Sequence, residues 1–155
     1  MTQDPIPSSQ NEDLSKPSLP VWFWIVAVVS LLWYLMDTSA FAMRLSLTDD
    51  IIATMPENQQ HLYRNMPVWV NAVFGIEAVG GLLGSLALLV RRKSALPLFV
   101  MSILGVIAQT SHIWFNSDAV STMGAPAIVM PLVAIIIGAL MILLTKSANA
   151  KGWLR

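Results

Sequence analysis

Glu77 is an acidic residue inside a long apolar stretch, and one side of the expected helix combines it with three glycines: Gly80, Gly81 and Gly84. Steps of three, four and seven residues return to the same side of a helix. An ionisable side chain at mid-depth in a bilayer is costly, so it usually faces protein or water. The pattern predicts a carboxyl group inside a helical bundle, where it either exchanges protons or serves as a hydrogen-bonded structural acid.

Polar residues also follow one side of the third apolar stretch, where spacings of three, four and three residues connect Ser102, Gly105, Gln109 and His112. With a rise of about 1.5 Å per residue from the outer ends of the stretches, Gln109 and His112 lie in the outer half of the membrane, as do Asp37, Asn71 and Glu77. We predict a ligand or proton site in an outward-facing cavity with Glu77 at its floor, formed by Glu77, Asp37, His112, Gln109 and Asn71.

Glycines at short spacing let helix backbones approach each other in bilayers, and a G-x-x-x-G pattern commonly marks a helix pair. The pattern occurs at Gly80 and Gly84. We therefore predict close helix packing at Gly80, Gly81, Gly84 and Gly105.

Histidine and carboxyl groups raise the question of metal or haem binding. A single membrane histidine, His112, argues against a bis-histidine haem, and His61 lies in a loop from which we do not expect it to reach the same site. A metal site from Asp37, Glu77, His112 and His61 lacks a ligand-spacing signature. We predict no metal and no cofactor, and no catalytic motif supports an enzyme.

The amino-acid composition indicates whether this chain is surrounded mainly by water or by lipid. Of 155 residues, 55% are apolar and 12% charged, and the mean hydropathy is +0.65. Nine basic and nine acidic residues balance, so nucleic acid is not an expected partner. The absence of cysteine excludes disulfides and thiolate chemistry. These values predict a protein whose partner is the lipid bilayer.

Four stretches reach the length of roughly 20 residues that a helix needs to cross a hydrocarbon layer. They cover residues 21–43, 68–90, 95–115 and 126–145. The first is too long for a signal peptide and follows a mildly acidic leader, so we expect it to be retained. The fold class is therefore all-α, a polytopic membrane protein with a bundle of four transmembrane helices. The fourth stretch lacks ionisable residues, so we expect it to face lipid while the first three form the functional side.

The polar segments before, between and after the apolar stretches define the domain boundaries and the loops. We predict a disordered cytoplasmic leader at residues 1–20, a transmembrane domain at residues 21–147 and a cytoplasmic tail at residues 148–155. The outer loop at residues 44–67 should form short interfacial helices, the first capped by Thr48. Residues 116–125 should form a short outer loop.

Basic residues predict the orientation. With the amino terminus inside, the outer side carries Arg44 and Arg64, and the cytoplasmic side carries Lys16, Arg91, Arg92, Lys93, Lys146, Lys151 and Arg155. Both termini are then cytoplasmic, in a bacterial inner membrane. Interfacial anchors are expected at Trp22 and Trp24 on the inner side and at Trp69 and Trp114 on the outer side.

Residues 75–84, GIEAVGGLLG, followed by Arg91, Arg92 and Lys93, resemble the second helix and inner turn of DoxX-like four-helix membrane proteins, in which an acid precedes a glycine pair and a basic turn. This resemblance implies an accessory membrane subunit of a quinone-linked redox complex, and only Glu77 and its glycines carry over. The whole chain also resembles small bacterial four-helix membrane proteins described as sugar transporters.

Three functional hypotheses follow. The first is binding or transport of a small polar solute, coupled to protons through Glu77, by a homo-oligomer that pairs through its glycine side or its fourth span. The second is a DoxX-like subunit of a larger membrane complex, whose outer cavity holds a quinone headgroup against Trp33. The third is a purely structural bundle.

Overall fold

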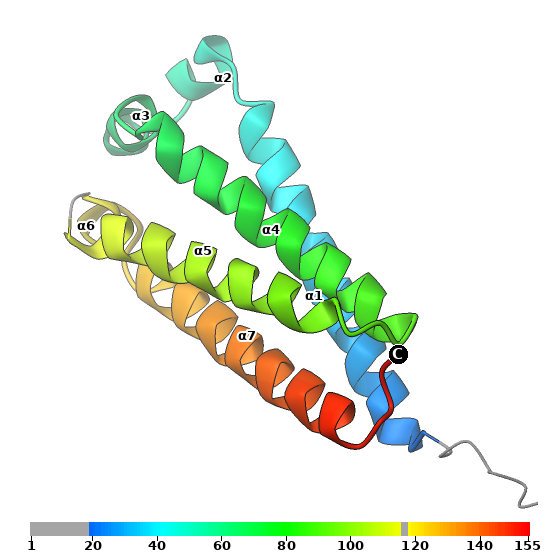
Figure 1. The fold of residues 1–155 in the computed structure, drawn as a ribbon. Helices are drawn as coiled ribbons and strands as arrows, with labels where there is room; N and C mark the ends of the chain where they lie inside the picture. The colour runs from blue at the N-terminus through cyan, green and yellow to red at the C-terminus, as the bar shows by residue number, and fades with distance from the viewer. Residues whose placement is uncertain (1–18, 116–117) are drawn as a thin grey trace, which may run out of the picture.

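The long helices form where the apolar stretches predict them. The computed structural model describes residues 19–115 and 118–155, which form seven helices (Figure 1). Four of these are long and apolar enough to cross a membrane: α1 (Val21–Leu45), α4 (Val68–Leu89), α5 (Ala95–Phe115) and α7 (Pro126–Ala150). The all-α prediction is confirmed. Most of the predicted leader, residues 1–18, lies outside the described residues.

Three short helices lie in the connections at one end of the bundle: α2 (Asp49–Ala53), α3 (Glu57–Arg64) and α6 (Ala119–Met123). We call this end the capped end. The opposite end holds the α4–α5 turn and residues 151–155, and we call it the terminal end. The side chain of Thr48 accepts a hydrogen bond from the backbone N–H of Ile51 over 3.5 Å and so caps α2 as predicted. Helix α6 falls within the predicted loop 116–125 and ends at Gly124, whose φ of 66° suits glycine.

The long helices pack in chain order, with contacts between α1 and α4, α4 and α5, and α5 and α7. At the terminal end, buried side chains of α1 and α7 belong to one apolar core, which includes Phe23, Leu88, Phe99 and Met141. Toward the capped end, α1 and α7 diverge on either side of the α4–α5 pair (Figure 1). The bundle is therefore closed at the terminal end and open between its outer helices at the capped end.

The predicted packing glycines lie at the helix contacts. A Cβ atom added to Gly81 would overlap the ring of Tyr34 on α1. On the α5 side of α4, a Cβ on Gly84 would lie 3.1 Å from the ring of Phe99, and one on Gly80 would lie 3.4 Å from the carbonyl oxygen of Leu98. These glycines are buried inside the chain's own bundle. The side of α4 that carries these glycines therefore packs against α1 and α5 of the same chain, and the homo-oligomer contact expected there stays a prediction.

The last residues do not extend from the bundle as a free tail. After α7 ends, Arg155 donates its backbone N–H to the carbonyl of Arg91 over 2.6 Å, and its own carbonyl accepts from Lys93 over 3.0 Å. The Arg91 Nε donates to the carbonyl of Trp153 over 2.8 Å, and the side chain of Leu154 is buried in the terminal core. The chain end is thus a packed part of the terminal end.

Pro131 lies inside α7. Proline has no N–H to donate, so the carbonyl four residues earlier loses its helical partner. That carbonyl belongs to Ala127, and the indole N–H of Trp114 on α5 donates to it over 3.1 Å. The α5–α7 contact at the capped end therefore compensates for the proline.

Candidate functional site

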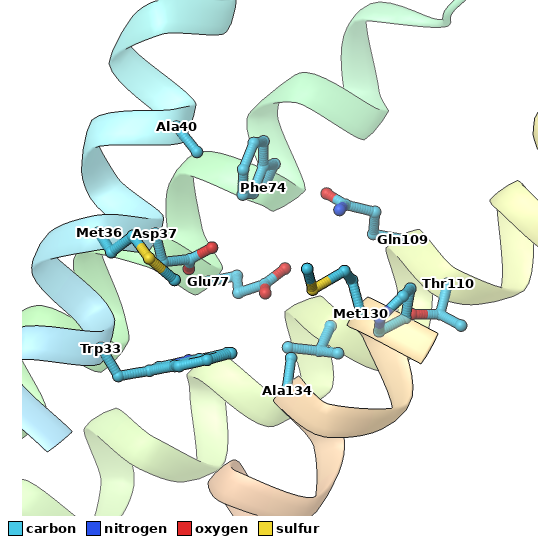
Figure 2. Close-up of a pocket in the computed structure, with 12 residues that line it drawn as sticks. Trp33, Met36, Asp37, Ala40, Phe74, Glu77, Gln109, Thr110, Met130 and Ala134 are labelled. Atoms are coloured by element: carbon cyan, nitrogen blue, oxygen red, sulfur yellow. The ribbon is translucent and has the colours of Figure 1, made fainter. Parts of the chain in front are cut away.

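A cavity of about 260 Å³ lies where α1 and α7 diverge, with α4 and α5 behind it. Its walls come from all four long helices (Figure 2). We call this space the Glu77 chamber and define it by Trp33, Asp37, Phe74, Glu77, Gln109 and Met130. Three of the five predicted site residues thus meet in one cavity.

Glu77 projects into the chamber from the middle of α4, and its residue is 4% exposed. Two contacts with α5 position its backbone: Ser102 Oγ donates to the Glu77 carbonyl over 2.9 Å, and a Cβ on Gly105 would lie 3.0 Å from the Glu77 Cβ. The absence of a side chain at Gly105 therefore lets α5 lie directly against this part of α4. The carboxyl oxygen Oε2 is buried and has no hydrogen-bond partner among the described residues.

Asp37 and Gln109 face the same space from α1 and α5 (Figure 2). Asp37 and Glu77 both line this cavity, Asp37 from α1 and Glu77 from α4. Gln109 Oε1 is buried, and no described residue donates a hydrogen bond to it. The rings of Trp33 and Phe74 lie on opposite sides of the Glu77 side chain in this view. The chamber therefore combines hydrogen-bonding oxygens with aromatic walls.

Other buried polar groups of the bundle are satisfied within the protein. Ser30 donates to the carbonyl of Ala27 over 2.9 Å, Ser85 to that of Gly81 over 3.0 Å, and Thr145 to that of Met141 over 2.6 Å. Within residues 19–115 and 118–155, the buried side-chain atoms without a partner are Arg44 Nη2, Asn71 Oδ1, Glu77 Oε2, Gln109 Oε1 and His112 Nδ1. Because native proteins rarely leave buried polar atoms unpaired, this group in the capped half is the candidate functional region.

His112 and Asn71 line other cavities, so the five predicted residues do not share one space. The ring of His112 packs edge-on against Trp69, with centroids 5.2 Å apart. It lines a second cavity of about 240 Å³ together with His61 and Asp118. His61 and His112 line the same cavity because α3 folds back over the capped end, and the prediction that His61 does not supply a second haem ligand stays a prediction. Even so, no cluster of three metal-ligating His, Cys, Asp or Glu side chains occurs in the described parts of the chain.

Helix α7 contributes Met130, Pro131 and Ala134 to the chamber wall. The expectation that the first three spans alone form the functional side is therefore wrong. That expectation relied on ionisable residues, whereas the contribution of α7 is apolar. The sequence signal for this part of α7 is Pro131, because a proline inside an apolar helix leaves a backbone carbonyl that needs another partner.

The chamber opens sideways, between α1 and α7. Met36 on α1 and Met130 on α7 both line it, yet they are 59% and 62% exposed, so they form its rim. A cavity opening along the long axis toward the capped end was expected. The lateral opening arises because α1 and α7 are not in close contact at this level of the bundle.

The predicted anchors lie at both ends of the long helices. Trp22 and Trp24 begin α1 at the terminal end, and Trp69 and Trp114 lie at the capped end. Trp22 also packs against Trp153 of the chain end, with centroids 5.9 Å apart. The interfacial role of these residues stays a prediction.

The fold and its hydropathy define a multi-pass, all-α protein with four helices suited to a membrane. Comparisons with protein families, curated proteins and solved structures gave no match. The function is therefore inferred from the geometry of the Glu77 chamber.

Proposed function

We propose that the protein binds a small, flat, amphipathic molecule in the Glu77 chamber, and that the ligand is a quinone-like headgroup. The observation that carries this proposal is the pair of unpartnered oxygens, Glu77 Oε2 and Gln109 Oε1, in one cavity. A buried polar atom without a partner costs free energy, and a ligand that bonds to it recovers that cost. In this binding mode the Glu77 carboxylic acid and the Gln109 amide N–H each donate to a carbonyl oxygen of the oxidised quinone. In the reduced quinol, Gln109 Oε1 instead accepts from a hydroxyl group.

The walls of the chamber suit a ring better than a sugar. Trp33 and Phe74 contribute aromatic rings, and Met36 and Met130 contribute flexible apolar side chains. Ligand sites of this kind are mainly apolar with a few placed polar groups. A small polar solute would leave most of these walls without complementary contacts.

The lateral opening supplies a route for such a ligand. When the four long helices span a bilayer, the rim at Met36 and Met130 faces hydrocarbon. A lipid-soluble molecule can then enter the chamber without passing through water, and its apolar tail can remain between α1 and α7.

Transport across the membrane is less well supported than binding. Beyond the chamber, the terminal half is filled by fully buried side chains, including Phe23, Leu88 and Phe99. A solute path would require this core to open. The proposal therefore favours a binding protein, such as an accessory subunit of a redox complex, over a proton-coupled transporter.

We also propose a bacterial inner-membrane location with both termini cytoplasmic. The terminal end combines the chain end with the basic turn Arg91, Arg92 and Lys93, which fits the positive-inside rule. If the protein forms oligomers, the contact most available is the exposed face of α7, which carries Ile136, Leu140 and Leu143.

Quinone binding can be tested on the full chain purified in a mild detergent. Solvent extraction followed by chromatography measures copurified quinone, and titration with a short-tailed benzoquinone measures affinity through quenching of tryptophan fluorescence. We expect near-stoichiometric quinone in the wild type. Gln109→Leu should bind about tenfold more weakly, because it loses one hydrogen bond to a buried group.

The controls separate the chamber from general partitioning into the detergent. Trp33→Phe should remove most of the quenching, because Trp33 is the indole in the chamber wall. Asp50→Asn changes a carboxyl on α2 outside the chamber and should bind like the wild type. Unchanged quinone affinity in Glu77→Leu would refute the proposal, and solute uptake by reconstituted vesicles that requires Glu77 would favour the transport hypothesis.

A further inference from the structure

Arg44 lies in the last turn of α1 at the capped end, outside the Glu77 chamber. Its guanidinium carbon is 5.7 Å from the centroid of the Phe74 ring. The Nη2 atom is buried, and the structure shows no hydrogen-bond partner for it in the described segments. A guanidinium group is permanently charged and carries five N–H donors, so a buried, unused donor here is suited to an anion.

Two cavities meet at Arg44. The smaller, about 120 Å³, brings Tyr63 and Asn71 beside it. The Tyr63 hydroxyl and the Asn71 amide N–H can both donate hydrogen bonds to an anion. These three side chains come from α1, α3 and α4, so the folding of α3 over the capped end assembles the donor group.

The larger cavity, about 230 Å³, is mainly apolar and extends from Arg44 and Tyr63 along Leu62, Met66 and Met123. It shares Met130 and Pro131 with the Glu77 chamber, so a chain placed in it would run beside the chamber wall. A cationic group at the edge of an apolar cavity matches a molecule with an anionic head and a hydrocarbon chain.

We propose that Arg44, Tyr63 and Asn71 bind the anionic headgroup of a membrane lipid, with one hydrocarbon chain in the apolar cavity. The anion is a phosphate or carboxylate, which the planar guanidinium can bind with two parallel hydrogen bonds. The apolar cavity favours a lipid over free phosphate, because free phosphate would leave it unfilled. This site is separate from the quinone site, so either can be present without the other.

Thermal unfolding of the purified full chain tests the lipid site, because a ligand that binds the folded state raises the unfolding temperature. The probes are phosphatidylglycerol, phosphatidylcholine and sodium phosphate, each added to protein in a nonionic detergent. We expect phosphatidylglycerol to raise the unfolding temperature of the wild type in a saturable way. Phosphatidylcholine and sodium phosphate at the same concentrations should have little effect.

Substitutions test whether the rise in unfolding temperature with phosphatidylglycerol arises from binding at Arg44. Arg44→Gln should abolish the phosphatidylglycerol shift, and Arg44→Lys should reduce it because lysine cannot form the paired hydrogen bonds. Arg64→Gln is the matched control, since Arg64 ends α3 at the same end of the bundle but lines none of these cavities. It should respond like the wild type.

Tyr63→Phe provides a second test that does not alter a long helix. It removes one donor to the anion and should weaken phosphatidylglycerol binding about tenfold. A full shift in Arg44→Gln would overturn the proposal, as would an equal shift with phosphatidylcholine. A shift with sodium phosphate alone that matches the one with phosphatidylglycerol would replace the lipid by a free anion and would also overturn it.

Discussion

Adjacent glycines on α4 should respond in opposite ways to the same substitution. Gly81 faces α1, where an added Cβ would overlap the ring of Tyr34 and lie 2.7 Å from its Cζ atom. Gly80 faces α5, where the nearest atom to an added Cβ is the Leu98 carbonyl oxygen at 3.4 Å. The methyl group therefore requires movement of a ring at one position and makes an ordinary contact at the other.

The magnitude follows from how tightly the Tyr34 ring is held. Tyr34 is buried, and its ring centroid lies 5.9 Å from that of Phe99 in the core. Overpacking a filled core costs about 1–3 kcal/mol. The gain in helix propensity from Gly to Ala, up to about 1 kcal/mol, is the same at both positions and cancels in their comparison. Gly81→Ala should therefore be about 1–3 kcal/mol less stable than Gly80→Ala.

The assay is equilibrium unfolding in mixed micelles with a denaturing detergent, followed by far-UV circular dichroism. Tyr34→Leu removes the ring, so adding Gly81→Ala in that background should cost less than in the wild type. This coupling is a double-mutant cycle on two contacting residues. The reasoning is refuted if Gly81→Ala is as stable as Gly80→Ala, or if the cost of Gly81→Ala is the same with and without the Tyr34 ring.

Further predictions concern the chain end and the buried acid. Leu154→Ala should lower the free energy of unfolding by about 2–3 kcal/mol in the same assay, because Leu154 is buried in the terminal core. Lys146→Ala, at an exposed position of α7, is its control, and equal stability of the two variants would indicate a free tail. Glu77→Met should raise the stability of the ligand-free protein by about 1–2 kcal/mol, since it removes an unpaired buried oxygen. It should also abolish quinone binding, and a loss of stability would show that the carboxyl is already satisfied in the folded protein.

The positions of the helices could be predicted from the sequence because they depend on neighbouring residues. A continuous apolar run long enough to cross a bilayer is helical for a local reason, since hydrocarbon cannot satisfy exposed backbone groups. The start of α2 at Thr48 is likewise a local capping pattern. Glu77, Gln109 and Asp37 were identifiable as candidates because a polar residue in an apolar run is visible without knowing its neighbours.

Which side chains meet was decided by the tertiary structure. His61 and His112 line one cavity because α3 folds over the capped end, and Leu154 is buried because the chain end returns to the α4–α5 turn. Helix α7 forms part of the chamber because α1 and α7 diverge at that level. None of these contacts leaves a periodic pattern in the sequence. Local composition therefore determined which segments are helices and where their polar residues lie, whereas the tertiary structure decided which side chains share a cavity, such as Glu77 and Gln109 where α1 and α7 diverge. The packing of the long helices depends on contacts between residues that are distant in the sequence, such as the ring of Tyr34 against Gly81, and local patterns do not encode these contacts.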